Sequence, residues 1–332
     1  MNRKIRVLFV YRSLQTFVKR DLKILKKHFD VKVIHYLGPK SLPIIWFKIL
    51  KGTLWADVTF CWFANVHAFL AIVFSKMFGK KSIVITGGYD VAKVPEIGYG
   101  LMSNHIANFL PKCSFNLADR VLPFSNSAKG EVLRHSHANF RKIRTVYLGL
   151  DCERYKPEGK KDTGLIITVS RVNNSNLKRK GLETFVKSAN FLPEARFVLI
   201  GEHADNSINY LKSIACPNVK FTNFVSSEEL LNYFQKAKVY VQVSAHEGFG
   251  LSLAEAMLCG CVPVVSRRGA IPEVVGDTGF YVPYGNPWAT AEAIRKALKS
   301  DKGKEAKKRI QSIFPLERRE RKLVRTIKDV LK

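Results

Sequence analysis

Two glutamates, Glu247 and Glu255, lie eight positions apart in the segment SAHEGFGLSLAEAMLCGCVPVVSRRGAIPEVV, residues 244–275. A helix is predicted to begin after the glycines, and its spacing places Glu255 on one stripe with Leu251, Ala254 and Leu258, facing the core. Charged side chains are rarely buried unless something pairs with them. We infer that the partner of these acids is a ligand.

The glycines between the two acids indicate what that ligand carries. Gly248 and Gly250 let the backbone approach a bound group closely, and the free amides at a helix start favour an anion. A phosphate on the amides and hydroxyl groups on the carboxylates would satisfy the whole segment, and a sugar nucleotide has both. The structural alternatives are an ordinary helix N-terminal acid at Glu247 and a buried ion pair with an arginine at Glu255.

Two cations stand where a second buried strand ends. The run LIITVS is predicted as a strand, Arg171 follows it directly, and Lys180 and Gly181 precede the next helix. Such cations can neutralise a diphosphate leaving group, although a solvated basic loop is the alternative. The chain has no D-x-D pair for Mg²⁺. We therefore expect protein cations to stabilise the diphosphate, with no metal and no cofactor.

Short β-branched runs alternate with amphipathic helical segments throughout the chain, which favours an α/β fold with parallel sheets covered on both faces. The polar stretch 151–164 is predicted to be a linker. The alternation then restarts, so we expect domains at 1–150 and 151–314 and a last helix within 315–332, with ligands at the carboxyl ends of the strands. The expected strands are 5–10, 31–36, 57–62, 82–86, 120–125, 143–148, 165–170, 196–200, 219–224, 238–243 and 262–266.

Composition narrows the class of protein. The 332 residues suffice for about two domains, and 55 Lys plus Arg against 27 acids give a net charge of +28. Such a charge suits nucleic acid, an anionic membrane or a phosphorylated molecule, or simply a solubilising surface. Six cysteines without a C-x-x-C pair indicate reduced thiols, and no signal peptide is visible, so we expect a cytoplasmic protein. The apolar run 58–74 is short and predicts a core strand and helix rather than a membrane span.

The motifs resemble those of the retaining GT-B glycosyltransferases of the family-4 type. The similarity covers most of 119–330 and also includes GLDCERYKP, FVLIGE, VKFTNFVSSEEL and DTGFYVP. It implies two Rossmann-like, doubly wound domains facing across a cleft. The domain 1–150 would bind the acceptor, 151–314 would bind the nucleotide sugar, and the helix 315–332 would cross back to the first domain.

The resemblance also implies a role for each motif residue. Glu247 would be the catalytic acid near the anomeric carbon, and Glu255 would bind the ribose hydroxyls. Arg171 and Lys180 would hold the diphosphate, and Val225 would meet the base through its backbone. The backbone amides that would cradle phosphate and sugar are those of Gly248, Phe249, Gly250 and Leu251.

The first half departs from the family pattern. The loop after the first strand, YRSLQTF, lacks the usual glycines, and Arg12, Ser13 and Gln15 are the candidates to replace them. The family's histidine beside the reacting centre is also missing from ITGGYDVAKVPEIGYG. The candidates on the acceptor side are therefore Gly87, Gly88, Tyr89 and Asp90, with a tight turn and a surface aspartate as the alternative.

The function implied is transfer of a hexose from a UDP- or GDP-sugar to a lipid, lipid-linked or glycan acceptor, with retention and without a side-chain nucleophile. Other enzyme classes are a sugar-nucleotide epimerase and a phosphorylase, for whose cofactor lysine we see no signal. A basic nucleic-acid binder is another alternative, but the chain has no zinc finger and no RRM motif. An NAD dehydrogenase is disfavoured because no G-x-G-x-x-G follows a strand. The apolar, basic segment 39–52 predicts either a helix packed on its own sheet or a peripheral contact with the inner face of the membrane.

Overall fold

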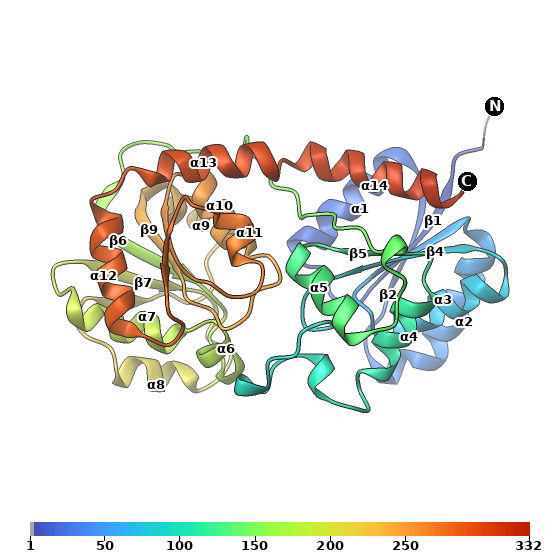
Figure 1. Ribbon diagram of the computed structural model, residues 1–332, viewed down its shortest axis with the longest axis horizontal. Helices are drawn as coiled ribbons and strands as arrows, with labels where there is room; N and C mark the ends of the chain where they lie inside the picture. Colours follow the sequence, from blue (N-terminus) through green and yellow to red (C-terminus); the bar gives the residue numbers. More distant parts are fainter. Residues whose placement is uncertain (1–2) are drawn as a thin grey trace. The chain divides into compact units, whose positions relative to one another are not determined.

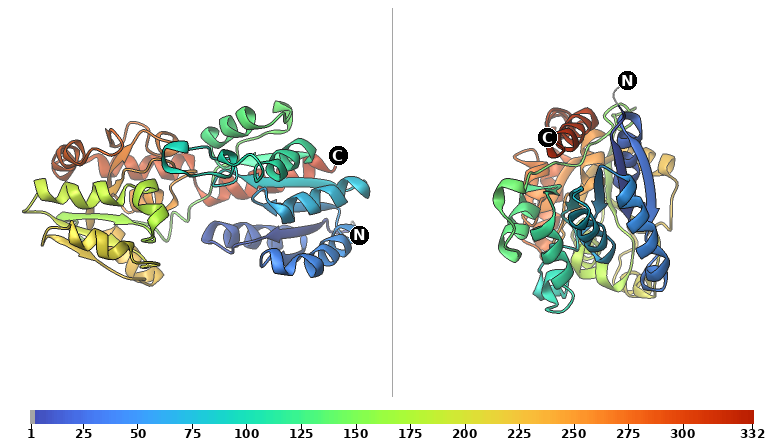
Figure 2. Two further views of the ribbon diagram at one scale, coloured as in Figure 1. Left: turned by 90° about the horizontal axis from the view of Figure 1, so that it is seen from below. Right: turned by 90° about the vertical axis from the view of Figure 1, so that its right-hand side faces the viewer.

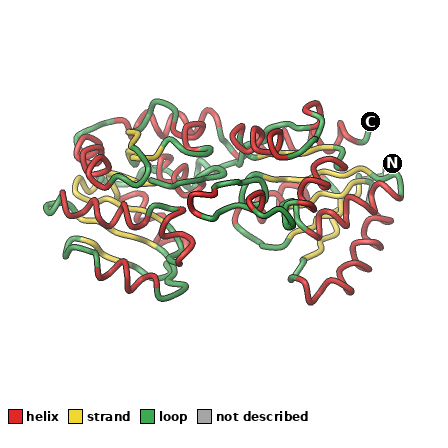
Figure 3. Tube along the Cα trace, turned by 60° about the horizontal axis from the view of Figure 1, so that its bottom comes forward, coloured by secondary structure: helices red, strands yellow, loops and turns green. Residues whose placement is uncertain are grey.

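The computed structural model describes residues 3–332, which divide into two compact units. Unit 1 holds the chain up to Gly149 together with Leu316–Lys332, and unit 2 holds Leu150–Pro315. Strands and helices alternate along each unit (Figure 3). Both units are built around a sheet whose strand pairs are all parallel, which confirms the predicted α/β class.

The sheet of unit 1 has the order β2-β1-β3-β4-β5. The order reverses at β1, because the chain first moves outward to β2 and then returns to the other side of β1 to form β3. The side chains of the central strands are almost fully buried, as expected of a sheet covered on both faces. The strands are β1 Arg6–Tyr11, β2 Asp30–His35, β3 Val58–Trp62, β4 Lys81–Thr86 and β5 Arg120–Pro123.

The helices of unit 1 lie on both faces of its sheet (Figures 1 and 2). Right-handed crossovers place α1 on one face and α2, α3 and α4 on the other, because the chain runs in opposite directions across the sheet before and after β2. The contacts of α2 with α3 and of α3 with α4 agree with this arrangement. The helices are α1 Thr16–His28, α2 Leu42–Trp55, α3 Val66–Met77, α4 Phe109–Leu117, α5 Asn126–His135 and α14 Leu316–Val330.

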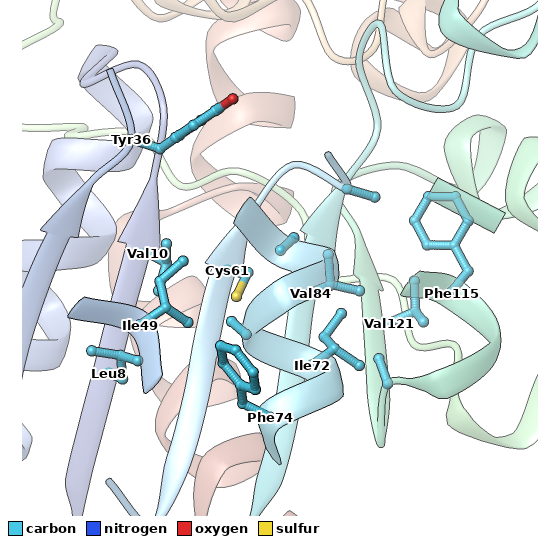
Figure 4. Packing of buried hydrophobic residues seen from close by; sticks show 14 of the residues in the cluster. Leu8, Val10, Tyr36, Ile49, Cys61, Ile72, Phe74, Val84, Phe115 and Val121 are labelled. Carbon is cyan, nitrogen blue, oxygen red and sulfur yellow. The ribbon is translucent and has the colours of Figure 1, made fainter. Parts of the chain in front are cut away.

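The core of unit 1 lies between its sheet and the α2–α4 layer (Figure 4). Alternate strand residues such as Leu8 and Val84 meet Ile49 of α2 and Ile72 of α3, and all four are fully buried. Gly52 allows α2 to sit close to β1, because a Cβ atom there would lie 2.7 Å from a methyl group of Leu8. Apolar burial of this kind contributes about 25 cal/mol per Å² and holds the layers together.

The sheet of unit 2 has the order β11-β10-β9-β6-β7-β8, so its first strand, β6, lies in the middle. Strands formed before α9 extend to one side of β6, and later strands extend to the other. The strands are β6 Asp162–Val169, β7 Arg196–Ile200, β8 Val219–Phe221, β9 Ala237–Gln242, β10 Val262–Ser266 and β11 Phe280–Val282.

Helices surround this second sheet, and α7 and α12 cover a core that includes Phe185, Phe197 and Ile294. A capping box formed by Ser226 and Glu229 begins α9. The helices are α6 Asn174–Arg179, α7 Leu182–Ser188, α8 Ser207–Ser213, α9 Ser227–Lys236, α10 Leu251–Leu258, α11 Ile271–Val275, α12 Pro287–Leu298 and α13 Lys302–Ile313.

Two sequence predictions of local structure are wrong. The run 143–148 is not a strand: it forms one isolated bridge, between Ile143 and Val121, although two amides bond to β5. The carbonyl groups of Val146 and Tyr147 instead accept hydrogen bonds from Arg319. The predicted linker 151–164 also ends early, because its last three residues already belong to β6.

Helix α14 is attached to α1 by a buried ion pair. The guanidinium of Arg319 donates two hydrogen bonds of 2.6 Å to the carboxylate of Asp21, and both side chains are essentially inaccessible. The same guanidinium lies 5.6 Å from the ring centre of Trp62. The Arg319 and Asp21 charges are thus paired, and the arginine also satisfies two backbone carbonyls, which burial of charge requires.

No helix among residues 3–332 is both long enough and apolar enough to cross a membrane. The run 58–74 forms β3 and most of α3, as predicted. All six cysteines are free, and Cys61, Cys259 and Cys261 are buried.

We expect Arg319→Ala to lower the free energy of unfolding by about 3–5 kcal/mol, because Asp21 would remain buried without its partner. The control is Arg321→Ala, an exposed position on the same helix, which should change stability by less than about 0.5 kcal/mol. Urea unfolding followed by tryptophan fluorescence measures both, since Trp62 lies beside the ion pair. Equal effects of the two substitutions would contradict the role given to this pair.

Candidate active site

The reversal of strand order in unit 2 falls between β6 and β9. These strands are neighbours in the sheet, with Ile166 opposite Val239 and Ile167 opposite Tyr240. The chain leaves their carboxyl ends in different directions, which opens a crevice where α/β proteins bind ligands. The segment after β6 carries Arg171 and Lys180, and the loop after β9 carries Glu247.

Lys180 and Glu247 meet across this crevice. The Nζ of Lys180 donates a hydrogen bond to Oε1 of Glu247, and a guanidinium nitrogen of Arg179 lies 3.8 Å from the same oxygen. The Lys180 and Glu247 side chains are 20% and 8% exposed. Burial acts to raise the pKa of Glu247, but the charges of Lys180 and Arg179 outweigh it and lower that pKa. Burial lowers the pKa of Lys180, and the charge of Glu247 opposes that shift. The site therefore holds an ionised carboxylate that contacts Lys180 and lies near Arg179.

Close backbone contact brings the two loops together. The amide of Ala245 donates to the carbonyl of Arg179 at 2.9 Å. Gly181 has a φ of +66°, and a Cβ atom at this position would lie 2.1 Å from the carbonyl oxygen of Val243. A side chain at 181 would push the loops apart and move Lys180 with them, so this glycine is required by the site.

A third loop, after β10, supports Glu247 from the other side. The amide of Ala270 donates to the carbonyl of Glu247 at 2.9 Å, and a Cβ atom on Gly269 would lie 2.4 Å from that oxygen. The hydroxyl of Ser244 lies 3.4 Å from Oε1 of Glu247. The acid is thus fixed by three neighbouring strand ends, those of β6, β9 and β10.

Helix α10 begins directly after this loop. Gly250 is its N-cap and has a left-handed backbone conformation, φ +89° and ψ +57°, which glycine adopts at little cost. The first amides of α10 have no partner within the helix and form a ready anion site. Glu255 lies one turn further along and is 5% exposed, so its predicted burial is confirmed. The predicted one-sided stripe is not, because Leu251 is half-buried and all residues from Leu253 to Leu258 are buried. Phe249 packs edge-on against Phe314 at 5.3 Å between ring centres.

The predicted donor residues Arg171, Val225 and Gly248 take no part in the ion pair of Lys180 and Glu247. Arg171 follows β6 but forms its ion pair with Glu202, at 3.1 Å, and both side chains are exposed. Val225 is half-buried in the loop between β8 and α9, at the edge of the sheet. Gly248, next to Glu247, is half-buried. The roles given to these residues stay predictions.

The structure corrects one expectation about the buried acids. The sequence led us to expect a ligand as the partner of the acid pair, but Glu247 has protein partners, Lys180 and Arg179. The sequence pointed to Lys180, but as a phosphate ligand and not as the partner of Glu247. No spacing rule connects residues 67 positions apart, and only the adjacency of β6 and β9 brings them together.

The candidates on the acceptor side lie in unit 1, directly after β4. Asp90 is buried, not at the surface, and its carboxylate accepts hydrogen bonds from the Thr86 hydroxyl and from the amides of Ala64, Gly87 and Gly88. Gly87 and Gly88 thus form a turn closed by Asp90. Tyr89 is 53% exposed. The acceptor role of this turn stays a prediction.

Sequence reasoning missed one unusual residue at the matching position of unit 1. Phe63 follows β3, beside the strand-order reversal, and has a φ of +65°, the only such non-glycine among residues 3–332. The amide of the next residue, Ala64, is held by Asp90. Strained backbone of this kind concentrates at functional sites, and nothing in the residue type signals it.

Comparisons with solved structures identify the fold. The Anabaena protein Alr3699/HepE, solved with UDP and glucose, superposes with a TM-score of 0.81 at 16% identity, over 98% of this chain and all of that one. Sucrose-phosphate synthase of Thermosynechococcus elongatus superposes with a TM-score of 0.80 at 16% identity, over 98% and 99% of the two chains. At this identity the likeness establishes the fold, which is that of the GT-B glycosyltransferases.

Sequence comparison shows which known proteins the chain is similar to. Residues 163–300, which lie in unit 2, match the model described as "Glycosyl transferases group 1". O-antigen chain mannosyltransferase B of Escherichia coli is 34% identical over 87 residues, which cover 26% of this chain and 23% of that protein. N-acetyl-alpha-D-glucosaminyl L-malate synthase of Bacillus anthracis is 24% identical over 262 residues, 74% and 66% of the two. The chain thus matches less than two thirds of the length of these relatives.

We expect Glu247→Gln to lower the free energy of unfolding by about 3 kcal/mol, because it leaves Lys180 buried beside Arg179 without a countercharge. Lys180→Met should cost less, since Arg179 remains near the acid. The double substitution should therefore be more stable than the sum of the single effects predicts. Urea unfolding of the four proteins gives the coupling energy, and strictly additive effects would show that the two side chains do not interact.

Proposed function

We propose that the chain is a retaining glycosyltransferase that moves a hexose from a UDP- or GDP-sugar to a lipid, lipid-linked or glycan acceptor. The observation that carries this proposal is the contact of Lys180 with ionised Glu247 at the strand-order reversal of unit 2, beside the free amides of α10. These groups match a donor that carries diphosphate, ribose and sugar. Alr3699/HepE, whose fold this chain shares, was solved with UDP and glucose.

Each of these groups has a proposed role in binding the donor. Lys180 has three N–H donors and uses one on Glu247, so the other two can reach phosphate oxygens. The α10 amides add dipolar stabilisation of the same phosphates. Glu247 then faces the sugar, where its negative charge stabilises a positively charged anomeric carbon. Glu255, on the buried side of α10, would accept hydrogen bonds from the ribose.

The reaction proposed needs no side-chain nucleophile. The bond between the anomeric carbon and the phosphate oxygen breaks, and an oxocarbenium-like sugar forms. The acceptor oxygen bonds to the same face of that carbon, and its proton passes to the departing phosphate oxygen. The protein contributes position and charge: Lys180 and the amides hold the leaving diphosphate, and Glu247 holds the sugar.

We also propose that the reaction is independent of metal. The support is that the chain has no D-x-D carboxylate pair that could hold Mg²⁺ against a diphosphate. The charge of the leaving diphosphate must then be balanced by Lys180, Arg179 and Arg171, all of which lie in the segment that follows β6.

A kinetic comparison of the two acids tests the assignment. We expect Glu247→Gln to reduce kcat by about 100-fold or more, because it removes charge that stabilises the transition state. Glu255→Gln should mainly raise KM and the Kd for the donor, because it removes a contact made equally before and during reaction. The donor is first identified by thermal shift with UDP- and GDP-sugars, since a specific ligand raises apparent stability.

Three results would contradict this assignment. Equal changes of kcat and KM in both variants would show that Glu247 and Glu255 do not have separate roles. Loss of turnover with EDTA would show that the reaction depends on a metal. Isotope exchange in the donor without any acceptor would indicate a sugar-nucleotide epimerase instead.

For the acceptor we propose a lipid or lipid-linked molecule, approached from the inner face of an anionic membrane. The support is the exposed face of α2, which we call the α2 face. Its apolar members are large and well exposed: Ile44 62%, Trp46 45%, Phe47 50% and Leu54 49%. Exposed apolar side chains that cluster in this way mark interaction sites.

The charges around the α2 face suit an anionic partner. Lys40, Lys48 and Lys51 are exposed among the apolar residues, and the sequence has no acid between Val31 and Ala56. Lys51 lies 4.5 Å from the ring centre of Phe47, so cation and aromatic ring are side by side. The opposite side of α2 packs on the sheet through Ile45 and Ile49. The helix is therefore anchored without its exposed face, which remains available for a lipid surface.

We expect the protein to bind vesicles of phosphatidylglycerol and phosphatidylcholine but not vesicles of phosphatidylcholine alone. Lys48→Ala/Lys51→Ala should weaken binding about 30-fold, at about 1 kcal/mol for each lysine. The matched control is Lys212→Ala/Lys220→Ala, two exposed lysines of unit 2. Vesicle co-sedimentation at low salt measures all three proteins. Absence of binding to the anionic vesicles, or a dimer that buries the α2 face, would contradict the membrane contact.

A further inference from the structure

Unit 1 contains a pocket of about 400 Å³ that the proposed reaction does not use. Its walls come from the loop after β4, from the start of α4 and from the end of α5. The lining residues are Lys93, Met102, His105, Asn108, Lys112, Leu133, Arg134, His135, Ser136 and His137. We call it the histidine pocket.

The lining of the histidine pocket includes lysine, arginine and histidine but no aspartate or glutamate. Six of its ten lining residues are lysine, arginine or histidine. The charge of Glu131, a buried residue of α5, favours protonation of His135, while the charges of Arg134 and Lys93 oppose it. A site with this excess of positive charge attracts an anion from solution. We propose that the histidine pocket binds a phosphate-bearing anion.

A buried amide adds a specific contact to this general attraction. Asn108 is 6% exposed and lines the pocket, and its side chain makes no capping hydrogen bond to α4. Its NH₂ group can donate two hydrogen bonds to phosphate oxygens.

His135 can gain a proton when an anion binds. Its Nδ1 lies 3.1 Å from the carbonyl oxygen of Val91, so Nδ1 carries the hydrogen. Burial lowers the pKa of His135, which keeps the free ring neutral. A phosphate beside the ring would favour a proton on Nε2, which would then donate to a phosphate oxygen. Binding of the anion is thus expected to be coupled to protonation of this histidine.

The size and apolar walls of the pocket indicate an organic phosphate. Met102 and Leu133 contribute apolar surface beside the cations. Val91, which fixes His135, is the neighbour of Asp90, whose carboxylate holds the Gly87–Gly88 turn. The pocket and the candidate acceptor turn therefore share one loop. The phosphate would then belong to the acceptor, an assignment that rests on the proposed function.

The test is a titration of the full chain with inorganic pyrophosphate, followed by NMR of the histidine side chains. Signals of His105, His135 and His137, assigned from His→Gln variants, should shift and reach saturation. His246 adjoins Glu247 and reports binding at the donor site separately, so failure of the proposed function does not hide this result. Lys93→Met/Lys112→Met should raise the Kd in the histidine pocket about tenfold, while Lys212→Met/Lys220→Met should leave it unchanged.

A second variant adds a charge without changing shape. Asn108→Asp places a carboxylate in the pocket wall and should abolish the shifts, with folding checked by circular dichroism. The proposal is overturned if the three histidine signals do not saturate at millimolar pyrophosphate, if sodium chloride of equal ionic strength shifts them equally, or if the lysine variant binds as well as its control. Tighter binding of glycerol 3-phosphate than of inorganic phosphate supports a phosphate ester as the ligand, and the reverse supports a free phosphate ion.

Discussion

The ion pair between Lys180 and Glu247 is the constraint on which the candidate active site depends. It joins the carboxyl ends of two strands that are neighbours only because the sheet of unit 2 reverses its order between them. A partly buried carboxylate needs such a cation, because desolvation alone would favour its neutral form. The pair in turn requires close backbone approach, which explains the glycines at 181 and 269. The site therefore depends jointly on local sequence, on sheet topology and on electrostatics.

Much of this arrangement could be predicted from the sequence, because its signals are local. Apolar β-branched runs predict the parallel strands, and the stripe with Ala254 and Leu258 correctly predicts that Glu255 is buried. The glycine at 250 predicts where α10 begins. The two acids and the cation at 180 could be singled out because each follows a buried strand, where α/β proteins place their ligands.

Other features depend on contacts between distant segments, which no pattern in one sequence reveals. Arg319 reads as one of many cations on a basic helix, yet it pairs with Asp21, 298 residues earlier. The run 143–148 has strand composition, but two of its carbonyl groups bind that arginine. The histidine pocket draws its cations from a loop and two helices, and each cation alone resembles ordinary surface charge.

The return of α14 to unit 1 has a consequence for biosynthesis. The ribosome completes the sheet of unit 1 first, but Asp21 must wait for Arg319, which emerges nearly 300 residues later. At about 5–20 residues per second, that delay is roughly 15–60 s. During this interval Asp21 lacks its partner, and the α1 surface that will receive α14 is accessible to chaperones and prone to aggregation. The part of the chain that is synthesised first is therefore the part whose folding is completed last.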